Sequence, residues 1–197
     1  MKCNNKNTRT FLIVYSVISF IYGLVLPFCY GNNPLSPTGT LSLMCEDRKF
    51  LFVLWAILVV GGIVLNIQYM YKKFGIRNTF LNFLNILSLV SMAGVTITLK
   101  HPIDSWNPKR VVHWITTGLY IVGVFAAIAL FFLIYRNTHK SFIFLFICVV
   151  AILLTFILIF AVVGKSALME MIPIAMLQIF LFVINFTPLI KTKQSEQ

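Results

Sequence analysis

Six long apolar runs occupy most of this chain, and each is long enough to cross a lipid bilayer. A helix needs about 20 apolar residues to span a hydrocarbon core of roughly 30 Å. The runs are continuous rather than alternating, and an isolated strand would leave backbone groups without hydrogen bonds in hydrocarbon. We therefore predict an all-α fold, a polytopic bundle of six transmembrane helices forming one domain over residues 1–197. The predicted spans cover residues 11–29, 50–71, 79–99, 111–135, 141–163 and 168–190.

The composition agrees with a fold embedded in lipid. Hydrophobic residues make up 59% of the chain and the mean hydropathy is +0.93, above the range of soluble domains. Basic residues precede the first run, as in a signal peptide, but this run is longer than the apolar core of such a peptide. It also ends in Pro27-Phe28-Cys29, which is not a small-residue cleavage site. We expect the first run to remain as the first span.

The basic residues are distributed unequally between the two sides of the predicted bundle. The chain has 16 Lys and Arg against 5 Asp and Glu, a net charge of +11. Such a balance often indicates nucleic-acid binding, but here the charges lie in the connections between apolar runs, so we expect no nucleic-acid partner. The side of the two termini carries Lys2, Lys6, Arg9, Lys72, Lys73, Arg77, Arg136, Lys140, Lys191 and Lys193. The other side carries Arg48, Lys49, Lys100, Lys109, Arg110 and Lys165.

The positive-inside rule then predicts a multi-pass protein of the cell membrane whose two termini both lie in the cytoplasm. The connections on the inner side are short, and the larger ones, residues 30–49 and 100–110, are expected outside. Chemistry beyond the spans is therefore expected at the outer face.

Polar residues recur at spacings of three or four along the third span, which places them on one helical face. They are Asn78, Asn82, Asn85, Ser88 and Ser91. The stripe could line a wet solute path, or it could form hydrogen bonds between helices. It contains no charged residue, which favours hydrogen bonding, because ion and proton paths usually need ionisable groups.

Glycines and prolines within the spans predict local packing. Gly61, Gly62, Gly118 and Gly123 are expected where helices approach closely. Pro173 is expected near a span end, where a missing backbone donor is tolerated.

The strongest candidate site is a polar cluster expected at the outer face. His101 and Asp104 precede Arg110 and His113 at the start of the fourth span, and Glu170 begins the sixth span at the same predicted depth. Imidazole and carboxylate groups could bind a divalent metal such as zinc or act as an acid–base pair. The basic residues could hold the phosphate of a lipid headgroup. The simplest alternative is an outer rim in which Glu170 pairs with Arg110 and His113 bonds to a neighbouring helix.

Motifs that would define an enzyme are missing from the sequence. It has no His-Glu-x-x-His pair and no Gly-x-Ser-x-Gly elbow. We assign no catalytic residue, metal ligand or cofactor. Cys29 and Cys45 both fall on the predicted outer side, where a disulfide is possible.

Parts of the sequence resemble a known six-helix membrane family. Residues 34–40, Pro-Leu-Ser-Pro-Thr-Gly-Thr, followed by Phe50-Leu51-Phe52, resemble an Ile-Ser-Asp-x-Gly signature. His113 is similar to a His at the head of the family's fourth span, and Gly164 with residues 170–172 resembles a Gly-x-x-Glu-Arg-Ile motif. The family is the bacterial domain of unknown function nine-nine-eight, which is similar to the eukaryotic DRAM/Frag/Sfk proteins.

The resemblance implies a six-helix fold and a membrane location, and it carries over four positions: Ser36, Gly39, His113 and Glu170. The charged residue of two motifs is replaced, by Pro37 in the first and by Met171 in the last. The family's biochemical role does not specify an activity.

Together these observations predict a non-enzymatic membrane protein that binds a lipid headgroup or small ligand at an outer pocket. The candidate ligand-binding residues are Ser36, Gly39, His101, Asp104, Arg110, His113 and Glu170. The alternatives are a small transporter or channel, a metal-dependent membrane hydrolase, and an accessory subunit. The expected partners are membrane lipids, and a second copy or another membrane protein is an open alternative.

Overall fold

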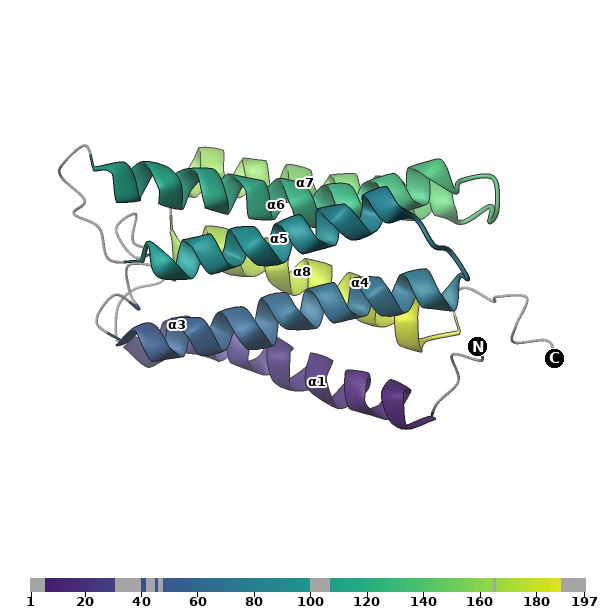
Figure 1. Ribbon diagram of the computed structural model, residues 1–197, viewed down its shortest axis with the longest axis horizontal. Helices are drawn as coiled ribbons and strands as arrows, with labels where there is room; N and C mark the ends of the chain where they lie inside the picture. Colours follow the sequence, from purple (N-terminus) through teal and green to yellow (C-terminus); the bar gives the residue numbers. More distant parts are fainter. Residues whose placement is uncertain are drawn as a thin grey trace.

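The computed structural model describes residues 6–30, 40–41, 45, 48–99, 107–164 and 166–188. Their helices lie lengthwise beside one another in one bundle (Figure 1). Six helical segments are long and apolar enough to cross a membrane, and no strand occurs within these residue ranges. The predicted all-α, six-helix membrane fold is confirmed.

The helix bounds follow the predicted spans closely. The first span is α1 (Lys6–Val25), extended by the 3₁₀ helix η1 (Leu26–Tyr30). The second is continuous but has three parts: α3 (Lys49–Trp55), the π-helix η3 (Ala56–Val60) and α4 (Gly61–Lys73). The remaining spans are α5 (Thr79–Ile97), α6 (Pro108–Ile134), α7 (Phe142–Val163) and α8 (Ala167–Phe186).

Short polar side chains set the starts of three spans. The Asn78 side chain accepts hydrogen bonds from two backbone N–H groups in the first turn of α5, at 3.0 and 3.2 Å. Asn107 caps α6 in the same way, just before Pro108, and Ser166 caps α8. Asn and Ser are favoured at this position because their oxygen satisfies an N–H that has no helical acceptor. Pro108 follows its cap because proline needs no donor in the first turn.

The start of α1 and the ends of α4 and α8 lie at the same end of the bundle, which we call the terminal end (Figure 1). There the Arg9 guanidinium donates to the carbonyl oxygen of Phe186 at 3.2 Å. The Lys73 ammonium donates to the carbonyl of Ile184 at 2.6 Å. The last carbonyls of a helix have no helical partner and carry partial negative charge, so these cations stabilise the end of α8.

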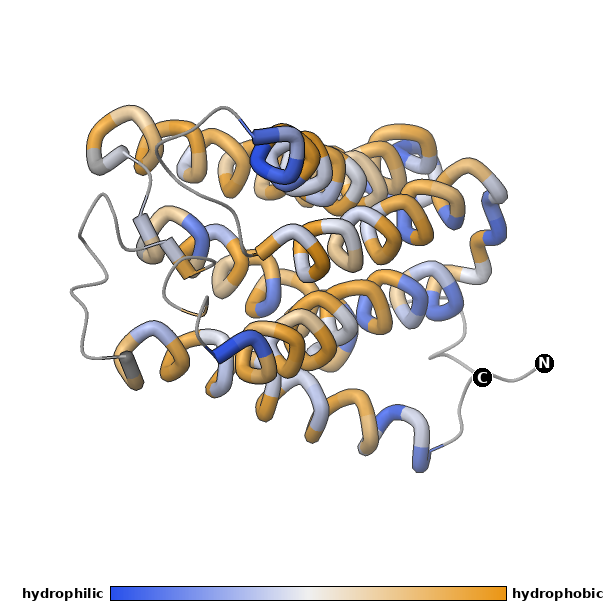
Figure 2. Tube along the Cα trace, turned by 60° about the vertical axis from the view of Figure 1, so that its left-hand side comes forward, coloured by the Kyte–Doolittle hydropathy of each residue, from blue (hydrophilic) through white to orange (hydrophobic). Residues whose placement is uncertain are grey.

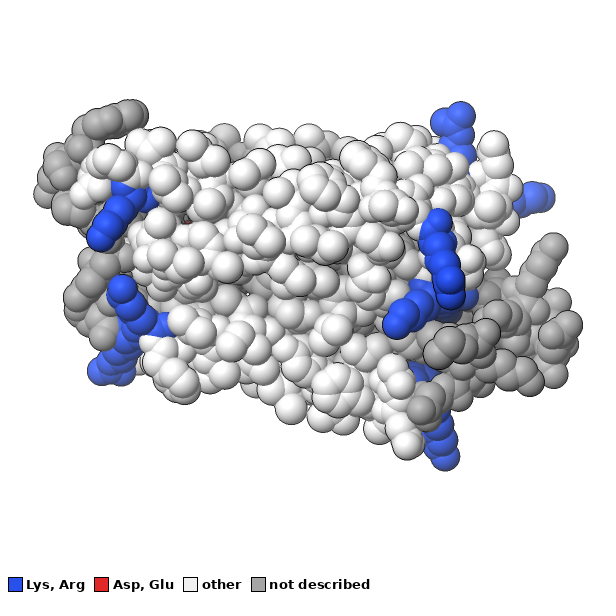
Figure 3. Space-filling view, in the orientation of Figure 1, with Lys and Arg blue, Asp and Glu red and all other residues white. Residues whose placement is uncertain are grey.

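An uncharged belt separates basic residues at the two ends of the bundle (Figures 2 and 3). At the terminal end the described basic residues are Lys6, Arg9, Lys72, Lys73, Arg77, Arg136 and Lys140. At the opposite end they are Arg48, Lys49, Lys109 and Arg110. Large apolar side chains are exposed along the belt, as expected for helices that face lipid.

The half of the bundle nearest the terminal end is filled by aromatic rings. Phe131, Phe132 and Phe142 are fully buried, and the ring centroids of Phe132 and Phe142 lie 5.3 Å apart. The Tyr71 ring stacks on Phe131 with centroids 5.0 Å apart, and its hydroxyl donates to the Ala127 carbonyl. These contacts join α4, α6 and α7 through dispersion and favourable ring geometry.

Buried polar side chains join α1, α4 and α8. The Asn66 amide donates to the Ser16 hydroxyl at 2.8 Å, and the Asn185 amide donates to the Asn66 side-chain oxygen at 3.1 Å. Nearer the opposite end, the Gln178 amide donates to the Ser19 hydroxyl. Such bonds hold helices together where hydrocarbon offers no competing partner.

The polar stripe of α5 is part of helix packing. The Asn82 oxygen accepts from Gln68 at 3.2 Å, and the Ser88 hydroxyl donates to a carbonyl of its own helix. The Asn85 carboxamide is buried, and neither of its polar atoms has a partner within hydrogen-bond geometry in the described part of the chain. None of the stripe residues lines the cavity described below, so the structure favours the packing interpretation over the solute path.

The predicted close approaches at glycines are only partly confirmed. A Cβ on Gly62 would lie 2.9 Å from the Ser19 hydroxyl, and one on Gly123 would lie 2.5 Å from the Ser88 hydroxyl. The prediction is wrong for Gly118, where a Cβ would meet open space, with no heavy atom within 4 Å among the described residues. Pro173 lies inside α8 rather than near its end, and it lines the same open space.

Candidate functional site

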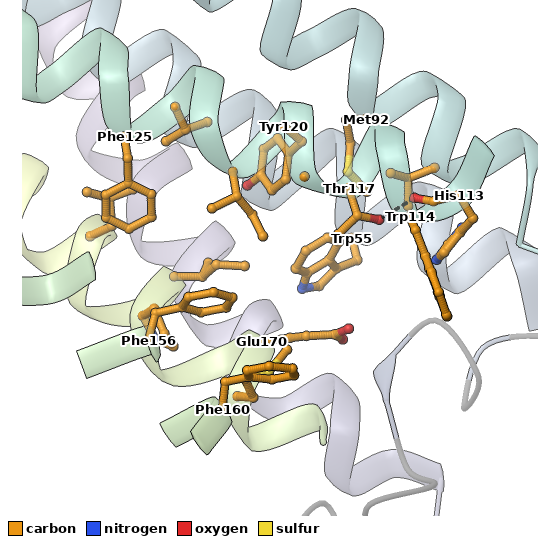
Figure 4. Close-up of a pocket in the computed structure, with 18 of the residues that line it drawn as sticks. Trp55, Met92, His113, Trp114, Thr117, Tyr120, Phe125, Phe156, Phe160 and Glu170 are labelled. Carbon is orange, nitrogen blue, oxygen red and sulfur yellow. Dashed lines mark hydrogen bonds between the residues drawn. The ribbon is translucent and has the colours of Figure 1, made fainter. Parts of the chain in front are cut away.

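A cavity of about 590 Å³ lies in the half of the bundle away from the terminal end. Figure 4 shows the side chains that line it. Side chains of α3, α5, α6, α7 and α8 form its walls, and nearly all of them are aromatic or aliphatic. Its volume lies within the range of about 300–1,000 Å³ typical of small-molecule sites. It is therefore a candidate binding site by size and shape.

The cavity exists because α7 packs closely along only part of its length. The buried side chains in its first half are Phe142, Leu145, Val149 and Ile152. The second half exposes most of its apolar residues, and it contributes only Phe156 and Phe160 to the cavity wall. Opposite them, α6 carries Gly118, which has no side chain to fill the space.

One face of α6 forms the longest wall. Trp114, Gly118, Ile121 and Phe125 follow at intervals of three or four residues, which places them on one side of the helix. From His113 to Phe125 the wall is about 18 Å long at 1.5 Å per residue. Trp114 is 48% exposed and Phe160 is 53% exposed although both line the cavity. The cavity therefore reaches the apolar surface of the bundle between α6 and α7.

A π-helical turn begins directly after Trp55, one of the cavity residues. The π-helix η3 adds a residue to the turn, and such turns often occur at functional sites. The Tyr15 hydroxyl donates to the Ile57 carbonyl of this turn at 2.7 Å. The Trp55 side chain is only 5% exposed, and its indole nitrogen lies 4.0 Å from the position that a Cβ on Gly23 of α1 would occupy. The sequence contains no signal for this turn that we recognise.

Glu170 is the charged residue of the cavity wall. It lies in the first turn of α8, after the Ser166 cap, and its carboxylate points into the cavity (Figure 4). One carboxylate oxygen accepts a hydrogen bond from the Leu41 backbone N–H at 2.9 Å. A backbone donor and a helix N-terminus both favour a negatively charged side chain.

His113 is a buried hydrogen-bonding group at the same end of the cavity. It is 4% exposed, and its Nδ1 lies 3.1 Å from the Thr98 hydroxyl at the end of α5. The Thr98 hydroxyl also donates to the Gly94 carbonyl at 2.7 Å, so it joins His113 to the last turn of α5. The bond from His113 to a neighbouring helix, which the outer-rim alternative included, is present, and His113 and Glu170 line one cavity.

Tyr120 adds a polar group to the wall that sequence reasoning missed. The side chain is 7% exposed, and its hydroxyl has no hydrogen-bond partner in the part of the chain that the structure describes. Like Trp55, it lies within an apolar run, where an aromatic residue gives no sign of whether it faces lipid, core or cavity.

Arg110 lies beside the cavity and is not part of its wall. Its guanidinium carbon is 4.7 Å from the centre of the Trp114 ring, a cation–π contact. The other predicted site residues, Ser36, Gly39, His101 and Asp104, lie outside the described residues.

Two further sequence-based alternatives concern metals and disulfides. No group of three or more His, Cys, Asp or Glu side chains that could hold a metal occurs among the described residues. The side chains of Cys29 and Cys45 are not joined by a disulfide; the former is exposed and the latter is buried.

Comparisons of this chain with protein-family models, with curated protein sequences and with solved structures give no match. The resemblance to the domain of unknown function nine-nine-eight stays a prediction from sequence.

Proposed function

We propose that this chain is a multi-pass protein of the cell membrane that binds an amphipathic molecule from the outer half of the bilayer. The apolar part of the ligand occupies the cavity between α6, α7 and α8, and its polar head lies beside Glu170 and His113. The observation that carries the proposal is an apolar cavity of about 590 Å³ with a carboxylate and an imidazole at one end.

The shape of the cavity supports an apolar ligand. Trp114 and Phe160 line it and are also exposed on the apolar surface of the bundle, so a hydrocarbon chain can enter from the side. Water does not occupy an apolar cavity stably, because it finds too few hydrogen-bond partners there. Hydrocarbon is the more suitable occupant of such walls.

The alternative functions receive less support. A transporter needs a path through the bundle, but Phe131, Phe132 and Phe142 fill the half beyond the cavity. A metal-dependent hydrolase stays a prediction, because two of its four proposed residues, His101 and Asp104, lie outside the described residues. An accessory role with a second copy or a partner membrane protein is compatible with ligand binding.

Mass spectrometry of the detergent-extracted protein tests the proposal. We expect a bound amphiphile in the wild-type protein and its loss in Gly118→Phe, whose ring would enter the cavity. Ile115→Phe is the matched control, because it adds a ring on an exposed position of the same helix. Equal retention of the amphiphile by the wild-type protein and by Gly118→Phe would show that the cavity is not the binding site.

The proposed orientation places both termini in the cytoplasm. Of the described Lys and Arg residues, seven lie at the terminal end and four at the opposite end, and the positive-inside rule places the richer end in the cytoplasm. Cysteines introduced at Lys109 and Lys72 of a cysteine-free variant test this in intact cells. A membrane-impermeant maleimide should label the first and not the second; the reverse pattern would invert the proposed topology.

A further inference from the structure

Tyr120 differs from other tyrosines of the spans in what its hydroxyl contacts. Tyr15, Tyr22 and Tyr71 each donate to a backbone carbonyl of another span, at 2.7, 3.1 and 2.8 Å. The Tyr120 hydroxyl has no acceptor in the part of the chain that the structure describes. An unpaired hydroxyl is costly in an apolar interior, and phenylalanine would fill the same volume without that cost. The hydroxyl therefore has no structural role among the described residues.

The Tyr120 oxygen faces the cavity. The residue is 7% exposed and lines the cavity, and its ring projects from α6 into it (Figure 4). The described side-chain atoms that lack a partner and are completely enclosed belong to Asn85 and Asn185. The Tyr120 oxygen is not one of them, so it keeps accessible surface, which the cavity provides. A molecule in the cavity can therefore reach this hydroxyl.

Tyr120 also lies near the middle of the membrane. The helix α6 runs from Pro108 to Ile134, and Tyr120 is about 18 Å from its start and about 21 Å from its end at 1.5 Å per residue. The phosphate and ester oxygens of a phospholipid stay outside the hydrocarbon core, roughly 15 Å from its middle. The head of a phospholipid therefore does not reach this hydroxyl.

Water alone satisfies the Tyr120 hydroxyl poorly. A buried water needs about two to four polar partners. Thr117, one turn earlier on α6, donates its hydroxyl proton to the His113 carbonyl of its own helix. The cavity residues that follow Tyr120 on α6 are apolar: Ile121, Val124 and Phe125. An oxygen atom carried by an apolar molecule fits this position better than a water molecule does.

We infer that the amphipathic ligand carries an oxygen acceptor inside its apolar part, such as the carbonyl of a ketone or quinone, and that Tyr120 donates to this oxygen near the middle of the bilayer. This inference rests on the proposed function and adds the chemical class of the ligand. The hydrogen bond fixes how deeply the ligand enters the cavity.

Fluorene and fluorenone test the inference, because they share one ring skeleton and differ in a carbonyl oxygen. Each is distributed between dodecyl maltoside micelles with and without the wild-type protein, so that partition into the detergent is subtracted. We expect the protein to bind fluorenone about fivefold more tightly than fluorene, the gain typical of one neutral hydrogen bond. The carbonyl stretching band of bound fluorenone should also lie at lower frequency than in empty micelles.

Tyr120→Phe removes the hydroxyl and keeps the ring. Its preference for fluorenone should fall to within about twofold, and the carbonyl band should return to its position in empty micelles. Tyr71→Phe is the matched control, because it removes the hydroxyl of a buried tyrosine that does not line the cavity. This control should keep the preference for fluorenone.

Equal binding of the two probes to the wild-type protein would overturn the inference and leave the cavity as a purely apolar site. A preference for fluorenone that persists in Tyr120→Phe would overturn it too, because another donor would then hold the carbonyl. If Tyr120→Phe does not fold, the wild-type infrared band decides, and an unshifted band contradicts the inference. Failure of both probes to bind would instead count against the proposed function.

Discussion

The two halves of this bundle are built from the same helices but differ in how their interior is filled. Near the terminal end, the rings of Phe131, Phe132 and Phe142 close the space between α6 and α7. In the other half, the same two helices leave a cavity beside Gly118 and Phe160. The comparison teaches that side-chain volume along α6 and α7 separates a stabilising core from a candidate binding site.

The largest expected difference between the halves is in the cost of removing a ring. Phe131→Ala should lower the free energy of unfolding by about 3–5 kcal/mol, because it leaves an unfilled hole in a packed interior. Phe160→Ala should cost much less, because that ring is half exposed and borders existing space. Thermal unfolding in detergent measures both, and equal losses would mean that the two halves are equally well packed.

Two glycines on α6 provide a matched pair for the second prediction. Gly123→Ala should destabilise the protein by about 1–3 kcal/mol, because its methyl group would meet Ser88 and the backbone of α5. Gly118→Ala should be neutral or stabilising by up to about 1 kcal/mol, since it has open space and alanine is the better helix former. The midpoint of unfolding in detergent distinguishes them; the opposite order would place the cavity on the wrong face of α6.

Two buried asparagines offer the smallest expected contrast. Asn66→Leu should lower the free energy of unfolding by about 0.6–2 kcal/mol, because Asn66 forms hydrogen bonds with Ser16 of α1 and Asn185 of α8. Asn85→Leu should cost less or even stabilise, since this carboxamide has no hydrogen-bond partner in the described residues. If Asn85→Leu lowered the free energy of unfolding more than Asn66→Leu in the same assay, the Asn85 amide would have a hydrogen-bond partner in the membrane.

The site was only partly predictable from sequence. His113 and Glu170 were singled out because they are ionisable residues at the starts of spans, and the structure places both in one cavity. Trp55 and Tyr120 were missed because an aromatic residue in an apolar run has no pattern that separates a lipid-facing ring from a cavity-lining one. Gly118 was predicted to be a point of close helix packing, but it faces open space. Its neighbour across this space depends on the position of α7, which the sequence around Gly118 does not determine.

The number, type and starts of the spans were determined by the sequence alone. Each depends on local properties: apolar length sets a span, and Asn78, Asn107 or Ser166 supplies the oxygen that caps the helix after it. Only the tertiary structure decided that α7 packs closely in one half and leaves room in the other. The space between helices is set by side chains that are distant in sequence and by the π-helical turn after Trp55, so no single segment contains that information.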